Sequence, residues 1–243
     1  MPLLSSDDRL PLYQRLRDQL AQDIADNRWC AGEAIPTEAV LANEYALSVG
    51  TIRKAIDLLV GERILERQQG RGTFIRRPQF HASLFRFFRF QTPDGERQIP
   101  QSQILAVQSL QASVEVARAL GLAADTPVIR LQRLRLLEEQ AVLAEEIWLP
   151  RERFKALLSL DLAEHGALLY PIYEEFCGQI VASADETLRA EAASEHHANL
   201  LGIAAQSPVV VIERLARNHA GQALEWRRSH GRASHFRYSV EIR

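Results

Sequence analysis

The chain has 243 residues, of which 47% are hydrophobic and 25% are charged, and its formal net charge is −2. This length allows two domains with separate cores, and the composition is ordinary for a soluble globular protein. No apolar run reaches the roughly 18 residues that a membrane span needs, and the N-terminal segment contains no apolar stretch of signal-peptide length. Cys30 and Cys177 lie far apart without zinc-ligand spacing. We therefore expect a cytoplasmic protein without a disulfide framework, a metal, a cofactor or a membrane partner.

Two helices are predicted first. Residues 10–27 have the apolar period of an amphipathic helix, and its buried stripe consists of Tyr13, Leu16, Leu20 and Ile24. A short second helix should begin at Thr37, whose hydroxyl can cap it after Pro36. The residues expected to point inward from this second helix are Val40, Leu41 and Tyr45.

A third helix is predicted from Ser48, a good N-cap residue, to Gly61, a good C-terminal stop. Its buried face consists of Ile52, Ala55, Ile56 and Leu59, and its outer face carries Thr51, Arg53, Lys54 and Asp57. Two short helices with a brief turn between them, the second with a polar outer face, fit a helix-turn-helix.

After Gly61 the hydrophobic period changes from helical to alternating. Residues 64–68 and 73–77 are predicted strands of a β-hairpin, with Gly70-Arg71-Gly72 at its tip. Glycines let the backbone approach a surface closely, and the arginine can enter a narrow minor groove. Gly-Arg-Gly alone indicates only a turn, but after a helix-turn-helix it favours a wing.

Basic residues concentrate in residues 48–77, although the whole chain is slightly acidic. Seven arginines and lysines lie there against three acidic residues, Asp57, Glu62 and Glu66. Such a patch can neutralise DNA phosphates and release counter-ions. A solvated charged face is the alternative interpretation.

We place a DNA-binding domain at residues 1–78 and a linker at 79–90, with a second domain at 91–243. The linker leads into a predicted strand that contains Phe87-Phe88-Arg89-Phe90. Further along, residues 151–160 and 167–176 are predicted helices, and 181–188 a predicted strand.

The second domain contains an internal repeat at an offset of 81 residues. Leu120-Gly121-Leu122 followed by Thr126-Pro127-Val128 matches Leu201-Gly202-Ile203 followed by Ser207-Pro208-Val209. Each copy is predicted as a helix, a long strand and a returning strand. A duplicated unit of this kind suggests two pseudo-symmetric halves that build one sheet with a shared cleft.

These features together resemble the winged helix of GntR-type regulators. The matching stretches are Leu12-Tyr13, Ile35-Pro36-Thr37-Glu38, Leu41-Ala42, Ser48, Thr51-Ile52-Arg53-Lys54-Ala55 and Gln69-Gly70-Arg71-Gly72-Thr73-Phe74-Ile75. The resemblance implies that DNA is bound by Thr37, Ser48, Gly50, Thr51, Arg53, Lys54, Gly70, Arg71 and Gly72.

The second domain resembles the UTRA effector domain of the HutC-like subfamily. The matching stretches are Ala117-Arg118-Ala119-Leu120-Gly121-Leu122, Pro127-Val128-Ile129-Arg130, Arg133-Leu134-Arg135, Glu145, Trp148-Leu149-Pro150, Leu169-Tyr170, Leu201-Gly202, Pro208-Val209 and Glu225. The resemblance implies an α+β fold like that of chorismate lyase, with an antiparallel sheet. It also implies a homodimer on a pseudo-palindromic double-stranded DNA operator, and a repressor that a small effector releases.

The helix-turn-helix departs from the pattern at two positions. Many relatives carry an arginine where this chain has Ala39, and another where it has Val49. An arginine that reads guanine contributes about 1–3 kcal/mol of discrimination between bases. We therefore expect an operator that differs from the common half-site of the family.

The effector site departs as well. Arg133 and Arg135 are present and should share one face of a strand, where two guanidiniums attract an anion. Leu168 replaces a serine of sugar-phosphate-binding relatives, and Gly231 replaces a tyrosine. The strand with Arg89 replaces a polar loop, so we expect an anion more apolar than a sugar phosphate, such as a carboxylate or phosphonate.

Several roles stay open at this stage. Glu145 and Glu225 either bind the effector or form ion pairs with Arg133 or Arg135. Tyr170 either lines the cleft or packs in the core, and His196-His197 fits a surface position better than a metal site.

We expect a regulator rather than an enzyme, because no nucleophile elbow, P-loop, dinucleotide fingerprint or acid/base pair is recognisable. Two rival classes are a lyase-like enzyme and an architectural DNA-binding protein whose second domain only dimerises. A fold alone does not confer the enzymatic function, and the architectural class leaves the paired arginines unexplained.

Overall fold

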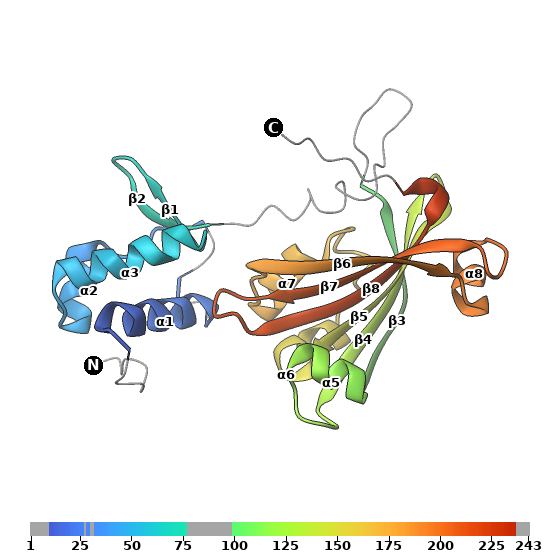
Figure 1. Cartoon of the computed structure of the whole chain (residues 1–243), viewed down its shortest axis with the longest axis horizontal. Helices are drawn as coiled ribbons and strands as arrows, with labels where there is room; N and C mark the ends of the chain where they lie inside the picture. Colours follow the sequence, from blue (N-terminus) through green and yellow to red (C-terminus); the bar gives the residue numbers. More distant parts are fainter. Residues whose placement is uncertain (1–9, 27, 30–31, 77–98, 237–243) are drawn as a thin grey trace. The chain divides into compact units, whose positions relative to one another are not determined.

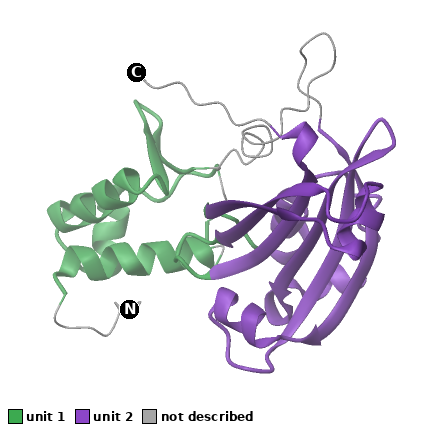
Figure 2. Ribbon diagram, turned by 45° about the vertical axis from the view of Figure 1, so that its right-hand side comes forward, with its two compact units in different colours: residues 1–78, 179–183, 217–222 green, residues 79–178, 184–216, 223–243 purple. Residues whose placement is uncertain are grey.

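The computed structural model describes residues 10–26, 28–29, 32–76 and 99–236, and the chain divides into two compact units (Figures 1 and 2). The first unit contains the N-terminal helices and hairpin, and the second contains a large sheet. The predicted linker 79–90 and its Arg89 lie outside the described residues, so the predicted domain boundaries stay predictions.

In its described residues, the first unit has three helices and a two-stranded antiparallel hairpin. The elements are α1 (Leu12–Ala25), α2 (Glu38–Tyr45), α3 (Val49–Gly61), β1 (Leu65–Gln68) and β2 (Gly72–Ile75). The core contains the predicted face of α3 and most of the predicted stripe of α1, including the fully buried Leu16, Ile24 and Ile52. Tyr13 of that stripe is only half-buried and lies outside the core. These elements confirm the predicted winged helix-turn-helix.

Both predicted N-caps of the helix-turn-helix are present. The Thr37 hydroxyl accepts the backbone N–H of Val40 at 3.4 Å, and the Ser48 hydroxyl accepts that of Thr51 at 3.2 Å. These bonds satisfy amide groups that have no partner inside a helix. Ala46, at φ 54°, makes the left-handed turn between the two helices.

The prediction that Val40 points inward is wrong, because 52% of this residue is exposed. The buried side of α2 consists of Leu41, Ala42 and Tyr45. Since each helical residue turns by about 100°, Val40 projects away from that stripe.

The hairpin of the first unit, which we call the wing, consists of β1, β2 and the turn between them. Its register pairs Leu65 with Ile75 and Gln68 with Gly72. Gly70 and Gly72 have φ values of 71° and 124°. Glycine adopts these values without steric cost, and a side chain here would be strained.

The second unit is built on a six-stranded sheet in the order β3-β4-β5-β8-β7-β6. Its strands are β3 (Gln101–Gln111), β4 (Pro127–Leu137), β5 (Gln140–Pro150), β6 (Ser183–Ala192), β7 (Pro208–Arg217) and β8 (Ala223–Arg232). β4 pairs antiparallel with β3 and β5, and β5 pairs antiparallel with β8. The predicted α+β class with an antiparallel sheet is confirmed.

The repeat comprises β3, α5 (Val114–Leu120), β4 and β5, followed by β6, α8 (Glu195–Leu201), β7 and β8. The sheet order is symmetric about the β5–β8 pair. Ser113 and Ser194 cap the two helices, and Gly121 and Gly202 end them in the left-handed conformation. Each copy therefore begins one strand earlier than the sequence match suggested.

The connection between the two copies differs from its prediction in detail. Residues 151–160 form two short pieces, α6 (Arg151–Phe154) and the 3₁₀-helix η1 (Lys155–Leu158), because the backbone leaves α-helical geometry at Phe154. The next helix, α7 (Leu169–Cys177), begins later than predicted and has Pro171 in its first turn, where no amide donor is needed. A second 3₁₀-helix, η2 (Ala233–His235), follows β8.

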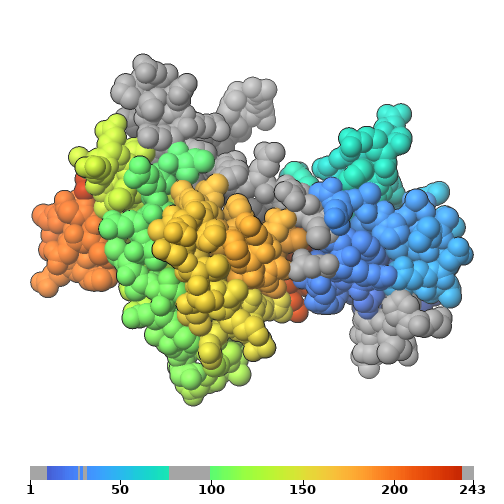
Figure 3. Space-filling model, turned by 180° about the vertical axis from the view of Figure 1, so that it is seen from behind, coloured from blue at the N-terminus to red at the C-terminus, as the bar shows by residue number. Residues whose placement is uncertain are grey.

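The two faces of the sheet carry different helices. α5 packs near Trp148 and Trp226, and α8 packs near Ala144. The neighbouring Glu145 and Glu225 therefore face the opposite side, because successive side chains of a strand alternate. That side is covered by α7, whose Tyr173 hydroxyl contacts Glu225; Figure 3 shows the segment of α6, η1 and α7 in gold. Within the described residues, no helix is both long and apolar enough to cross a membrane.

Candidate nucleic-acid interface and anion site

The start of α3 presents hydroxyl groups and an exposed arginine. The Ser48 and Thr51 hydroxyls lie 2.9 Å apart, and Gly50 lies between them in the first turn. Arg53 follows with 61% of its side chain exposed. Recognition helices contact DNA through residues near their N-termini, so the predicted contacts lie at the expected end of the helix.

Arg53 is paired with an acidic residue that was not among the predicted DNA contacts. Its Nε and Nη2 donate to Oε2 of Glu38 at 3.0 and 2.8 Å. Lys54 lies elsewhere on α3, with its Nζ 3.8 Å from the centroid of the Tyr13 ring of α1. The two predicted cations of α3 thus have different surroundings.

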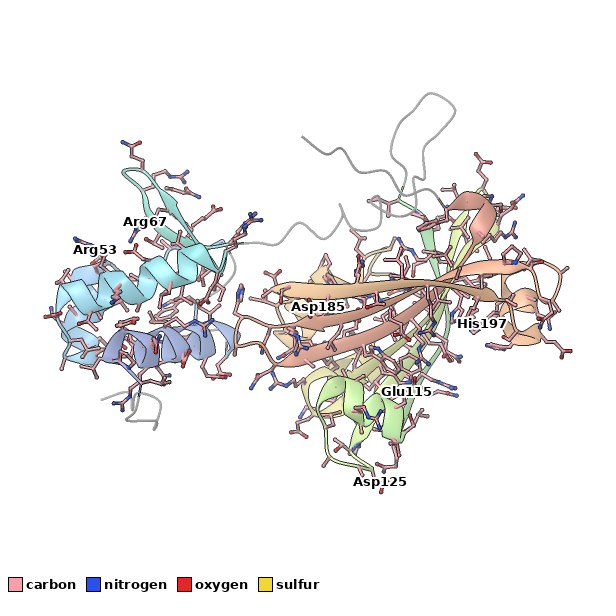
Figure 4. The ribbon with its side chains drawn as sticks, viewed as in Figure 1. Arg53, Arg67, Glu115, Asp125, Asp185 and His197 are labelled. Atoms are coloured by element: carbon pink, nitrogen blue, oxygen red, sulfur yellow. The ribbon has the colours of Figure 1, made fainter. Side chains whose placement is uncertain are left out.

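The wing contributes one predicted arginine and one that was not selected. Arg71 is exposed between its two glycines, and its guanidinium lies 5.7 Å from the centroid of the Phe74 ring. Arg67 of β1 forms an ion pair with Asp57 of α3 at 2.6 Å. Figure 4 labels Arg53 and Arg67 on α3 and on the wing. The basic run of residues 48–77 contained Arg67, but its partners follow only from the packing of β1 beside α3.

The predicted arginine pair of the second unit lies on one buried face of β4. Arg133 is 2% exposed and Arg135 is 0% exposed, and the buried residue Leu131 precedes them on the same face. The residues between them are half-buried, as strand alternation predicts.

Arg133 is engaged by Glu145 of the neighbouring strand. Its Nε donates to Oε2 of Glu145 at 2.5 Å, and Oε1 accepts the Ser229 hydroxyl at 2.9 Å. Arg227 adds an ion pair to Glu145 at 3.5 Å. Burial alone would raise the pKa of Glu145, but Arg133, Arg227 and Arg135 hold it well below its usual value. The carboxylate is therefore ionised and shared between arginines.

Arg135 differs from Arg133 because part of its guanidinium has no partner. Its Nη1 donates to the carbonyl oxygen of Ala167, which precedes α7. Among the described residues, nothing accepts a hydrogen bond from its buried Nε or Nη2. Burial, reinforced by Arg133, lowers the pKa of Arg135 to about 10. Arg135 is still a cation at neutral pH, and one edge of its guanidinium has no hydrogen-bond acceptor among the described residues.

A second group of charges lies on β7, β8 and α7. Arg227 Nη2 and the Tyr173 hydroxyl each donate to Oε2 of Glu225 at 2.8 Å. The Tyr170 hydroxyl donates to Oε1 of Glu225 at 3.3 Å and accepts from Nη1 of Arg214 at 3.3 Å. Burial raises the pKa of both tyrosines, so they act here as neutral donors.

These contacts show an ion pair for each glutamate, and effector binding by Glu145, Tyr170 and Glu225 stays a prediction. Glu145 forms the predicted ion pair with Arg133, whereas Glu225 pairs with Arg227 instead of the β4 arginines. Tyr170 is half-buried and joins the polar cluster rather than an apolar core. Arg227 was not among the predicted site residues, although strand alternation places it on the same face as Glu225.

The histidines show no metal-binding arrangement in the part of the chain that the structure describes, where no group of three or more His, Cys, Asp or Glu side chains could hold an ion. His196 is exposed, as predicted. His197 stacks on the buried His230, with ring centroids 3.5 Å apart.

The two units define a class of protein: a winged helix-turn-helix DNA-binding unit joined to an α+β unit with a buried, cation-rich cluster. The model of the gntR family of bacterial regulatory proteins matches residues 12–75, and the UTRA domain model matches residues 96–237. The chain therefore belongs to the GntR-family transcription regulators that carry a UTRA domain.

Three relatives illustrate this similarity. The transcriptional repressor NagR of Bacillus subtilis is 27% identical over 90% of both chains. The mannosyl-D-glycerate transport/metabolism system repressor MngR of Escherichia coli is 24% identical over 95% of both chains. Among solved structures, the ligand-binding domain of a protein described as a GntR-family regulator from Bordetella bronchiseptica is 33% identical. It covers 65% of this chain and 98% of its own, with a TM-score of 0.57.

Proposed function

We propose that this protein is a transcriptional repressor that a small, singly charged anion releases from its operator by binding at Arg135. The repressor role rests on two relatives that are named as repressors. Each of them aligns with this chain over nearly its whole length. We further propose that it acts as a cytoplasmic homodimer on a pseudo-palindromic operator, because two copies of one winged helix match two half-sites.

The observation that carries the effector proposal is the unsatisfied edge of Arg135. Nε and Nη2 lie on the same edge of the planar guanidinium, and their parallel N–H groups match the two oxygens of a carboxylate or phosphonate. A buried donor without a partner costs free energy, which an acceptor from a ligand removes. The free edge of Arg135 therefore favours an oxyanion.

The charges of the cluster support the same proposal. Among the residues that the structure describes, it contains four arginines and three glutamates, namely Arg133, Arg135, Arg214 and Arg227 with Glu145, Glu186 and Glu225. The arginines of this described cluster therefore exceed its carboxylates by one. Buried charges are stable only when they are paired, so one negative charge from a ligand would complete the cluster.

The ligand should be more apolar than a sugar phosphate. Arg133 is already engaged by Glu145, which leaves a single guanidinium edge rather than two for the anion. Leu168, half-buried beside the Ala167 carbonyl that contacts Arg135, offers apolar surface and no hydroxyl. These features favour a monocarboxylate or a phosphonate monoanion, with Arg133, Glu145, Tyr170 and Glu225 around it.

A thermal-shift screen of the full chain tests the class of effector. Small carboxylates, phosphonates and sugar phosphates are compared at equal concentration, and each stabilising compound is added to the complex with an operator selected from random DNA. We expect the apolar monoanions to raise the unfolding temperature and to release the DNA. Stabilisation by sugar phosphates alone would overturn the proposed class, and stabilisation without release would favour a purely architectural role.

A further inference from the structure

Charged side chains from three elements of the first unit form one connected network, and it does not belong to the core. Glu38 begins α2 and Arg53 lies on α3, while Asp57 is one turn further along α3 and Arg67 lies on β1. Oε2 of Glu38 accepts from Arg53, and Oε1 of Glu38 lies 3.7 Å from Nη2 of Arg67. The same Nη2 lies 2.6 Å from Oδ1 of Asp57.

The network is accessible to a ligand. The side chains of Arg53, Arg67 and Asp57 are 61%, 46% and 51% exposed. Exposed ion pairs contribute little to folding stability, because water solvates the separated charges well. The network lies across the recognition helix and the wing. We therefore infer that it affects DNA binding rather than folding.

Glu38 is held in place by its position at the start of a helix. It is the first residue of α2, directly after the Thr37 cap. The positive end of the helix dipole favours a carboxylate there. The helix therefore stabilises a negative charge on the surface on which Arg53 and Arg67 lie.

We propose that Glu38 and Asp57 are internal counter-ions of the DNA-binding surface, and that Arg67 is a further DNA contact. In the free protein their carboxylates occupy the guanidiniums of Arg53 and Arg67. DNA phosphates must displace these carboxylates before they can pair with the guanidiniums. Part of the electrostatic free energy of DNA binding is lost in breaking the internal ion pairs. The proposal rests on the assignment of α3 and the wing as the DNA-binding surface.

This exchange affects the operator and other DNA sequences alike. Sequence-independent binding is supplied almost entirely by phosphate neutralisation and counter-ion release, so it bears the full cost of displacing the carboxylates. Binding at the operator bears the same cost, and its contacts to base edges add to the same phosphate contacts. Glu38 and Asp57 thereby lower the overall affinity for DNA without contacting a base.

The test compares affinities of the full chain for its selected operator and for a scrambled duplex, each over a range of KCl concentrations. We expect Glu38→Gln and Asp57→Asn each to strengthen binding to both duplexes about two- to fivefold, with the ratio of operator to scrambled affinity nearly unchanged. We expect Arg67→Gln to reduce the slope of log affinity against log salt by about one unit on both duplexes. Asp57→Asn tests the proposal from α3 if Glu38→Gln disturbs the start of α2.

Glu62→Gln is the matched control, because Glu62 pairs with Arg17 of α1 and lies outside the network. Nε of Arg17 lies 3.0 and 2.9 Å from the two carboxylate oxygens of Glu62, and Nη2 also donates to Glu62. This variant should leave both affinities unchanged. The proposal is overturned if Asp57→Asn leaves both affinities unchanged, if the control strengthens them equally, or if Arg67→Gln keeps the wild-type slope. Failure of the effector proposal would alter none of these values, whereas failure to select any operator would reject the DNA-binding surface itself.

Discussion

The arginines of the two units are paired with carboxylates in opposite environments. In the winged helix, Arg53 and its partner Glu38 are accessible to water. On the sheet, Arg133 and its partner Glu145 are almost completely buried. The same chemical pair is exchangeable in one place and fixed in the other, because only the exposed pair can separate into solvent at low cost. We propose that arginine accordingly binds DNA phosphates at the surface and a single small anion in the interior.

The largest expected effect lies in the buried pair. Glu145→Ala leaves Arg133 and Arg227 buried without their shared carboxylate, and we expect a loss of about 3–5 kcal/mol in the free energy of unfolding. Urea denaturation followed by circular dichroism measures it. The exposed-pair variant Asp57→Asn is the control, with an expected loss below about 1 kcal/mol. Equal losses in the two variants would contradict the distinction between the two environments.

A pH dependence follows from two buried histidines. Burial lowers the pKa of His219 and His230 to about 4, below the unfolded value of 6.5. Between these values the unfolded chain binds a proton that the folded protein does not. The contribution of these histidines to the free energy of unfolding is therefore fully present above pH 6.5 and is lost as the pH decreases towards 4. At the steepest point the free energy of unfolding falls by about 1.4 kcal/mol per pH unit for each histidine.

Urea titrations at several pH values between 7.5 and 4.5 measure this slope. His230→Gln should remove the contribution of one histidine and make the curve shallower. The exposed His196 supplies the control, and His196→Gln should leave the slope as it is. If the His230→Gln variant has the same dependence of unfolding free energy on pH as the wild type, burial does not keep His230 neutral in the folded protein.

A smaller effect is expected at the start of the recognition helix. Val49 is exposed there, so Val49→Arg can reach the major groove without disturbing the core. We expect the variant to gain about 1–3 kcal/mol of preference for guanine at one position of each half-site. Selection from random DNA with both proteins measures the change. If the wild-type protein already selects the common half-site of the family, the proposed difference in operator is wrong.

Local patterns in the sequence predicted much of the fold and only part of the candidate sites. Strand alternation placed Arg133 and Arg135 on one face, and cap residues located both helices of the helix-turn-helix. The Ala167 carbonyl that contacts Arg135 lies 32 residues away in the sequence, so that contact depends on how α7 and its preceding loop cover the sheet. The inward prediction for Val40 failed because eight residues of α2 give too short a period to define one stripe.

The ion-pair partners of the surface arginines could not be predicted from the sequence either. Asp57 and Arg67 are ten residues apart and lie on different elements, α3 and β1. Composition revealed a basic run, but only the folded hairpin brings this pair within 2.6 Å. Patterns within one element were therefore predictable, whereas contacts between elements were not.

The most direct test of the central claim is release of the selected operator by a stabilising monoanion, followed by fluorescence anisotropy for the wild type and for Arg135→Gln. A lost hydrogen bond to a charged group weakens binding by about 1.5–3 kcal/mol, so the concentration that gives half-release should rise roughly ten- to hundredfold. The control Arg189→Gln changes an exposed arginine of β6 and should match the wild type. Unchanged release by the Arg135 variant, with operator affinity and folding intact, would contradict the account.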